Sequence, residues 1–186
     1  MEEGTIIVAW VCVKNKQLAI APCFALPVQV YNEKCTNGSL QLDGTMLGAC
    51  STSPDALNIH LFPLLVDMNT KRNDSTPGVC YAVVHILIVN NKMGVDGPTL
   101  GNALSVFRRE AAKVNGGRMK DPHRIKTDGG ACEHDACRRS LPVTRRIVEL
   151  WHWRRKWNEA IKKLQRLGHL DATGAAALSA RTSAES

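Results

Sequence analysis

Basic side chains and tryptophans are concentrated between residues 138 and 166 of this chain. This stretch holds ten lysines and arginines against two acids, a local charge of +8, while the whole chain carries +7. Three of the four tryptophans, Trp151, Trp153 and Trp157, lie in the same stretch. Guanidinium and ammonium groups at this density attract polyanions, and aromatic rings stack on nucleic-acid bases. The composition therefore indicates a nucleic-acid-binding segment.

Eight basic side chains of this stretch are the predicted phosphate contacts. They are Arg145, Arg146, Arg154, Arg155, Lys156, Lys162, Lys163 and Arg166, with Trp151 as the residue that stacks on a base. The sequence lacks the patterns that read base edges, such as a helix-turn-helix, an aromatic RNA-recognition signature or a complete zinc finger. We therefore expect sequence-tolerant binding to the backbone of RNA or DNA, with RNA as the first choice.

The same segment also fits two other partners. A basic amphipathic helix with tryptophans is typical of helices that dock in a protein groove, as calmodulin targets do, and of helices that lie on a membrane surface. The alternative hypothesis is therefore a protein-interaction module whose helix docks on an acidic or hydrophobic partner groove or on a membrane surface. In the plainest interpretation, the apolar side packs on the rest of the protein and the bases form a solvated face.

A second group of residues has the side chains that zinc prefers. His123, Cys132, His134 and Cys137 offer two imidazoles and two thiolates, and nearby glycines would let the chain wrap around an ion. Their spacing matches no common zinc finger. A zinc-stapled binding protein is accordingly a further alternative, in which the metal has a structural role and holds the segment that precedes the basic helix.

The remaining histidines and cysteines form no catalytic pattern. His60 and His85 lie within apolar runs, where core histidines are expected. Cys50 and Cys80 each follow a glycine by two residues, but neither stands between a strand and a helix as a nucleophile elbow requires. No glycine-rich loop has the spacing of a phosphate-binding P-loop. The sequence thus predicts a non-enzymatic binding protein with no cofactor other than the candidate zinc.

A basic amphipathic helix is the element expected to carry the phosphate contacts. With successive residues set 100° apart, most apolar side chains of residues 141–168 fall on one side and most bases on the other. Ser140 or Thr144 is the predicted N-cap, and Gly168 is the predicted left-handed residue that ends the helix. Residues 118–140, rich in charge and glycine, are expected to form a loop, which is where the candidate zinc staple lies.

Residues 1–92 are expected to form a β-rich core. The apolar runs 5–13 and 18–31 predict a hairpin, although prolines interrupt the second run, and the run 79–89 predicts a central strand. From 93 to 117 apolar residues recur every three or four positions, which predicts a helix packed on the core. The predicted fold class is α+β, with an antiparallel β-barrel or sandwich core followed by two helices, the last one basic and amphipathic.

The two halves of the chain carry opposite charge. Residues 1–100 have a net charge of −2 and residues 101–186 of +9, so the C-terminal half is the one that faces an anionic partner. The tail 169–186 is rich in Ala and Ser and has no clear pattern, and we expect other subunits of a larger assembly to hold it. These features suit a structural subunit of a ribonucleoprotein or viral particle.

Location is predicted from two further observations. No run approaches the ~20 apolar residues of a membrane span, and the first residues lack the positive charge of a signal peptide. The seven cysteines are odd in number and have no framework spacing, which favours reduced thiols. We expect an intracellular protein without a transmembrane segment, in the cytoplasm, the nucleus or an organelle.

Overall fold

The chain divides into an N-terminal unit, Met1–Ile147, and a C-terminal unit, Val148–Ser186. The computed structural model describes residues 6–14, 17–35, 39–49, 57–67, 80–90 and 94–184. Within these ranges no helix combines the length and the apolar character that a bilayer crossing requires.

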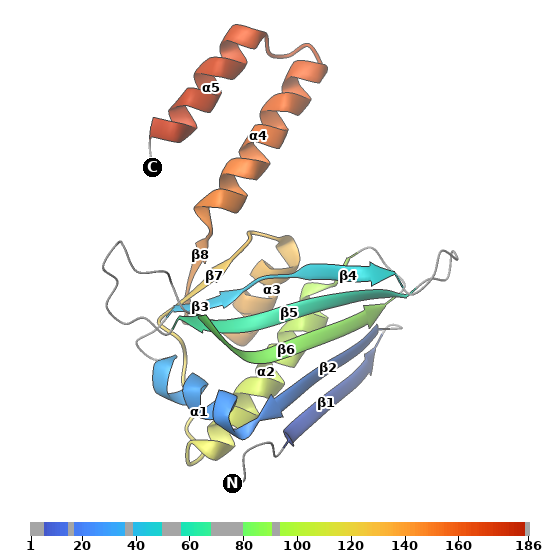
Figure 1. Ribbon diagram of the computed structural model, residues 1–186, viewed down its shortest axis with the longest axis vertical. Coiled ribbons are helices and arrows are strands. Elements are labelled where there is room, and N and C mark those ends of the chain that lie inside the picture. The colour runs from blue at the N-terminus through green and yellow to red at the C-terminus, as the bar shows by residue number, and fades with distance from the viewer. Residues whose placement is uncertain are drawn as a thin grey trace. The chain divides into compact units, whose positions relative to one another are not determined.

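One mixed sheet organises the N-terminal unit (Figure 1). The strands along its path, in spatial order, are β1 (Ile6–Lys14), β2 (Gln17–Phe24), β6 (Cys80–Asn90), β5 (Asn58–Asp67), β3 (Ser39–Leu42), β7 (Arg124–Thr127) and β8 (Arg145–Val148). A further strand, β4 (Thr45–Ala49), pairs with β5 next to β3. The β1–β2 hairpin lies at one end of this path, and β8 lies at the other.

The α+β class is confirmed, but the sheet is open and is not closed into a barrel. Its path ends at β1 and at β8, and no pairing joins these two strands within the described ranges. The expected all-antiparallel pairing is also wrong at one place, because β3 and β7 run parallel, with Leu40 opposite Ile125. Parallel neighbours require a long crossover connection. Here residues 43–123 provide it.

β5 and β6 form the centre of the sheet and pair antiparallel from Asn58 opposite Asn90 to Asp67 opposite Cys80. Every second residue of β5 is buried, so one face of the strand carries the core. β6 lies between β2 and β5, as the sequence predicts for a central strand. His60 on β5 is buried, whereas His85 on β6 is exposed and is not the core histidine that its apolar neighbours suggested.

Helix α1 (Ala25–Lys34) replaces the second half of the predicted strand 18–31. Val28 and Tyr31 are buried at helical spacing, and Cys35 continues the same row just after the helix. Pro27 lies in the first turn of α1, where the absence of a backbone N–H costs no helical hydrogen bond. The proline that suggested a broken strand is therefore compatible with the start of a helix.

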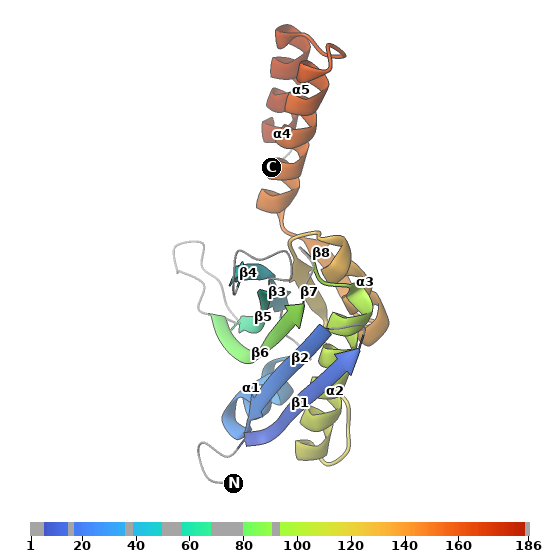
Figure 2. The same cartoon turned by 90° about the vertical axis from the view of Figure 1, so that its right-hand side faces the viewer.

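Helix α2 (Gly97–Val114) lies within the predicted range 93–117 and packs against α1 and the strands β1, β2 and β6 (Figure 2). The Asp96 carboxylate accepts the Thr99 N–H at 2.7 Å, and Pro98 lies in the first turn, which together fix the helix start. Phe107 of α2 is fully buried, and its ring meets that of Tyr31 edge-on with centroids 5.0 Å apart. This contact joins α1 to α2 in the core.

The predicted loop 118–140 is wrong, because it contains β7 and helix α3 (Ala131–Ser140). Gly129 has a φ of 77°, and the Gly130 N–H donates to the Asp128 carboxylate at 2.6 Å, so a tight turn leads into the helix. α3 packs against α2, and its buried residues are Glu133, Ala136, Cys137 and Ser140. Because two of these four side chains are polar and the other two are small, the helix has only a weak hydrophobic periodicity.

The C-terminal unit contains helices α4 (Leu150–Arg166) and α5 (Ala172–Ala184), which pack against each other. The predicted helix 141–168 starts nine residues too early, since Arg145–Val148 is strand β8 and the N-cap position belongs to Glu149 rather than to Ser140 or Thr144. The tail expected to lack structure contains α5. At its start, the Asp171 carboxylate accepts the Gly174 N–H at 2.7 Å, as an N-cap does.

Candidate nucleic-acid interface

The predicted phosphate contacts divide between the two units. Arg145 and Arg146 lie on β8 and are both exposed. The other predicted contacts are on α4, namely Arg154, Arg155, Lys156, Lys162, Lys163 and Arg166. The backbone N–H of Arg145 donates to the His123 carbonyl at 3.3 Å, which ties β8 to the segment before β7. The single basic helix of the sequence prediction is thus a basic strand followed by a separate basic helix.

Helix α4 has a defined end. Gly168 has a φ of 71°, as the sequence predicts, and its N–H donates to the Gln165 carbonyl at 3.0 Å. The His169 N–H donates to the Leu164 carbonyl, also at 3.0 Å, which completes a Schellman motif. The 17 residues of α4 span about 25 Å at 1.5 Å per residue. The basic side chains of α4 are therefore distributed along a helix of this length.

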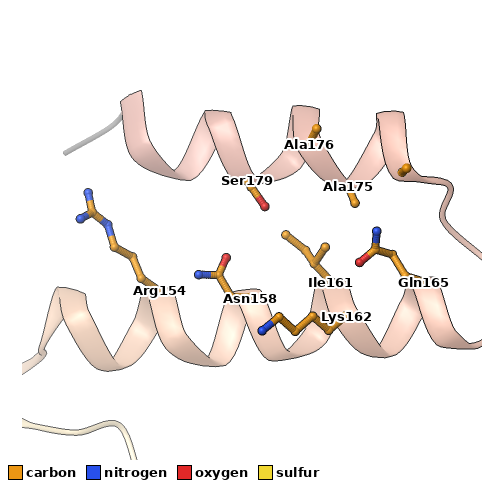
Figure 3. A pocket seen from close by; sticks show the side chains of 9 residues that line it. Arg154, Asn158, Ile161, Lys162, Gln165, Ala175, Ala176 and Ser179 are labelled. Carbon is orange, nitrogen blue, oxygen red and sulfur yellow. The ribbon is translucent and has the colours of Figure 1, made fainter.

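One side of α4 faces α5. Ile161 and Ala175 are buried between the two helices, with 5% and 6% of their surface exposed. A polar hollow of about 420 Å³ lies beside them. Figure 3 shows four α4 side chains directed towards α5: Arg154, Asn158, Ile161 and Gln165. Arg154 is half-buried, so it is the least accessible of the predicted contacts on α4.

The other five bases of α4 are exposed and form two rows. Arg155, Lys162 and Arg166 follow one another at spacings of seven and four residues, which puts them on one side of the helix. A second row contains Lys156 and Lys163, also seven residues apart. α4 has a single acid, Glu159, which pairs with Arg155 at 3.1 Å, so the helix keeps a net charge of +5. An exposed pair of this kind is weak and is readily exchanged for a phosphate.

Two tryptophans border the row of Lys156 and Lys163. Trp153 and Trp157 stack on each other with ring centroids 5.7 Å apart and planes 5° apart. Both remain accessible, with 45% and 37% of their surface exposed. The side chain of Trp151, the predicted stacking residue, lies outside the described part of the structure. Trp153 and Trp157, which the predicted site residues did not include, are therefore accessible aromatic surfaces on this helix.

The four candidate zinc ligands are not brought together. His123 and His134 are exposed, Cys137 is fully buried, and Cys132 is half-buried. The last three lie on α3, where Cys132 is two residues from His134 and five from Cys137, spacings that direct its side chain away from theirs. Within the described ranges, no group of three or more His, Cys, Asp or Glu side chains could hold a metal ion. Burial raises the pKa of both thiols to about 12, so the thiolate form that binds zinc is disfavoured.

A small hollow of about 190 Å³ brings together His60, Cys132 and Glu133, which sequence analysis did not connect. Burial raises the pKa of the Cys132 thiol, and the carboxylates of Glu133 and Asp96 raise it further. The thiol is therefore protonated at neutral pH. A protonated thiol is a poor nucleophile, so this hollow lacks the activated cysteine that covalent catalysis requires.

Sequence analysis also missed a cluster of arginines in the N-terminal unit. Arg108 and Arg109 of α2 and Arg139 of α3 line one hollow of about 540 Å³. The sequence contained a signal for it, because Arg108 occupies a position on the apolar side of α2 where a charge needs a specific partner. The partner could not be identified from the sequence because it comes from a distant segment.

Comparison of the chain with protein-family models, with curated proteins and with solved structures finds no match.

Proposed function

We propose that α4 binds the phosphate backbone of a nucleic acid, single-stranded RNA in the first instance, without strong sequence preference. The observation that carries the proposal is the set of five exposed bases on a helix that contains one acid. Each base that reaches a phosphate releases a condensed counterion, and this release drives backbone binding. A structural role in a ribonucleoprotein or viral particle is the biological setting that fits such a function.

The exposed tryptophans favour single strands over a duplex. Bases of a single strand can stack on aromatic side chains, whereas the bases of a duplex are covered by one another. Trp153 and Trp157 offer such a surface beside Lys156 on the same helix. Every base has a π-face, so this arrangement supports binding that tolerates sequence.

A salt titration tests the proposal. Binding of a fluorescent single-stranded RNA is measured by anisotropy at increasing salt concentration. If α4 engages five phosphates, the log–log plot of affinity against salt has a slope of about −3.5, at roughly 0.7 per phosphate for single strands. No saturable binding at low salt would remove the proposal.

A charge-reversal variant locates the binding surface. Lys163→Glu combined with Arg166→Glu removes one base from each row, and we expect the slope to become shallower by about 1.4. The matched control reverses Arg118 and Arg124, two exposed arginines of the N-terminal unit, and changes the net charge equally. An equal loss of binding in both variants would mean that net charge, and not α4, causes the interaction.

A protein partner is the second candidate, and one observation favours it. Four apolar side chains of the C-terminal unit are exposed in a single row at spacings of four, seven and three residues: Trp153, Trp157, Leu164 and Leu167. Amphipathic helices use such rows to dock in grooves. Capture of partners from a lysate, with and without nuclease, separates the candidates. Proteins that remain bound after nuclease but are lost with Trp153→Ala and Trp157→Ala would favour the groove.

A further inference from the structure

The arginine-lined hollow of the N-terminal unit is separate from α4 in the sequence and has no role in the proposed function. It has a volume of about 540 Å³ and lies between α2, α3 and the turn that follows α3. Its polar lining consists of Asn102, Ser105, Arg108, Arg109, Arg139 and Ser140. The lining contains three guanidinium groups and, among the described residues, no carboxylate, and two of these groups, those of Arg108 and Arg139, pair with carboxylates outside the lining. The volume is within the range of sites that bind small molecules.

Arg108 is the fixed element of this hollow. Only 9% of its surface is exposed, and its two terminal nitrogens donate to the Ser140 carbonyl and to the Asp121 carboxylate. The Nε–H group is buried and has no hydrogen-bond partner among the described residues. A buried guanidinium is costly unless it is paired, so the two contacts hold its position. The wall of the hollow therefore carries a pre-oriented cation.

Arg109 and Arg139 are the accessible cations. Arg109 is exposed and forms no ion pair with a described residue. Arg139 donates to the Asp135 carboxylate at 2.7 Å, and Arg138 donates to the same carboxylate at 2.8 Å. These hydrogen bonds hold the pKa of Asp135 below its usual value, so it stays ionised and neutralises one of the two arginines. The rim of the hollow thus keeps an excess positive charge.

The remaining lining residues fit a ligand that has polar and apolar groups in addition to an anionic group. Asn102 and Ser105 precede Arg109 on α2 by seven and four residues, so an amide and a hydroxyl lie on the same side of the helix as its guanidinium. Met119 and Pro142 are exposed and give the hollow an apolar edge. Ligand sites commonly combine an apolar surface with a few polar groups that fix orientation.

We propose that this hollow binds the phosphate group of a small phosphate ester, for example a nucleoside monophosphate. Guanidinium groups donate two parallel hydrogen bonds to phosphate, which is why arginine is preferred at such sites. Two accessible arginines and one buried arginine converge from α2 and α3, which form extensive contacts with each other. The site is preformed because the helices that carry the arginines are already packed.

Calorimetric titration of the full-length chain tests this site with three probes: adenosine monophosphate, inorganic phosphate and succinate. Saturable binding of the nucleotide, tighter than that of inorganic phosphate, assigns the site to a phosphate ester. Equal binding of the two assigns it to the phosphate group alone. Binding of succinate as tight as that of both phosphate probes, or no saturable binding of either phosphate probe, overturns the proposal.

Variants show where the probe binds. Arg109→Gln combined with Arg139→Gln is expected to weaken phosphate binding at least tenfold without unfolding the protein, because both side chains are exposed. Arg118→Gln combined with Arg124→Gln is the matched control and should bind as the unchanged protein does. Unchanged binding by the first pair overturns the proposal. Lys163→Glu with Arg166→Glu should leave nucleotide binding intact, so this site and the RNA-binding helix fail or succeed independently.

Discussion

The two units use the same dipeptide in different ways. In α2, the first arginine of the Arg108–Arg109 pair is buried and held by Ser140 and Asp121, while the second is exposed. In α4, the first arginine of the Arg154–Arg155 pair is half-buried beside α5, and the second is exposed and pairs with Glu159. Two adjacent arginines on an amphipathic helix therefore predict positive charge. The residues around them determine whether each side chain is held in one position or can exchange partners.

The units also differ in the amount of core that supports them. The N-terminal unit buries apolar side chains from five strands and three helices in one cluster, and the large ones come mainly from β3, β5, β6 and α2. In the C-terminal unit, Ile161 and Ala175 are the only described apolar side chains that are buried. Helical stability in proteins comes mainly from tertiary packing. We therefore expect the C-terminal unit to open more readily than the N-terminal unit, and the following experiments test this difference.

The largest effect is expected from Phe107→Ala in the N-terminal unit. Phe107 is fully buried and contacts the ring of Tyr31, so its removal leaves a cavity and loses an aromatic contact. We expect a loss of about 3–5 kcal/mol in the free energy of unfolding, measured with denaturant. Leu26→Ala is the control, because Leu26 is 51% exposed and should have little effect. Equal effects of the two substitutions would contradict the position of the core.

Arg108→Met should have the next largest effect. The substitution keeps much of the volume but leaves the Ser140 carbonyl and the Asp121 carboxylate without their donor. We expect a loss of about 2 kcal/mol in the free energy of unfolding, since a buried acceptor becomes unsatisfied. Arg109→Met, one residue further along, should change stability far less, and a reversed order of the two would show that Arg108 is not the fixed cation.

Ile161→Ala tests the small core of the C-terminal unit. The loss should be about 2 kcal/mol, at the low end for this type of change, because Ile161 borders an open hollow. The effect should be confined to α4 and α5. Amide hydrogen exchange should become faster in these two helices and stay unchanged in β5 and β6. Leu167→Ala serves as the control, since Leu167 is 58% exposed. If amide exchange in the unsubstituted protein is slower in α4 and α5 than in β5, the C-terminal unit does not open more readily than the N-terminal unit.

Gly168→Ala should weaken the end of α4 by a smaller amount. An L-residue with a side chain resists the φ of 71° that the Schellman motif requires, at a cost of about 1 kcal/mol. Circular dichroism and amide exchange of residues 162–169 measure the loss. The control is Ala160→Gly, an exposed position within α4, which destabilises the helix interior without altering its end. Unchanged exchange at the helix end would show that Gly168 does not act as a cap.

A pH effect that comes from cysteine ionisation is confined to the N-terminal unit, because residues 148–186 contain no cysteine. Burial raises the pKa of Cys132 and Cys137 from the ordinary thiol value of 9.0 to about 12, so the thiols of the unfolded chain ionise first as the pH rises. Thiol ionisation therefore leaves the stability unchanged below about pH 9 and lowers it progressively between about pH 9 and pH 12. The free energy of unfolding, measured with denaturant, should fall between pH 7 and pH 10. This fall should be smaller for the double variant Cys132→Ala, Cys137→Ala than for the unchanged chain. At pH 7 thiol ionisation makes no contribution, which is why this effect is the smallest.

Local patterns in the sequence predicted several elements well. The continuous apolar run 79–89 identified β6 as a central strand, and the apolar residues at every third or fourth position of 93–117 identified α2. Gly168 was identified as the end of α4 because glycine is favoured where φ is positive. These features depend on neighbouring residues, so they can be inferred from a short window of sequence.

Other elements depend on contacts between distant segments and were not predicted. α1 and α3 were missed because Pro27 resembled a break and because the buried face of α3 mixes small and polar side chains. The start of α4 was placed at residue 141, since Ser140 and Thr144 resemble N-caps, whereas residues 145–148 join the sheet as β8. The arginine hollow also needs α2 and α3 to pack, which no local pattern shows. The basic residues of α4 were identified from composition alone, but their exposure required the structure.

The parallel pairing of β3 with β7 has a consequence for the order in which the protein forms. Residues 39–42 must wait for residues 124–127, so this part of the sheet cannot be completed on the ribosome until about two thirds of the chain has been synthesised. Contacts between such distant segments slow folding because a long loop must close first. Until then the free edge of β3 can pair with another strand, and nascent chains of this protein would benefit from a chaperone that covers it.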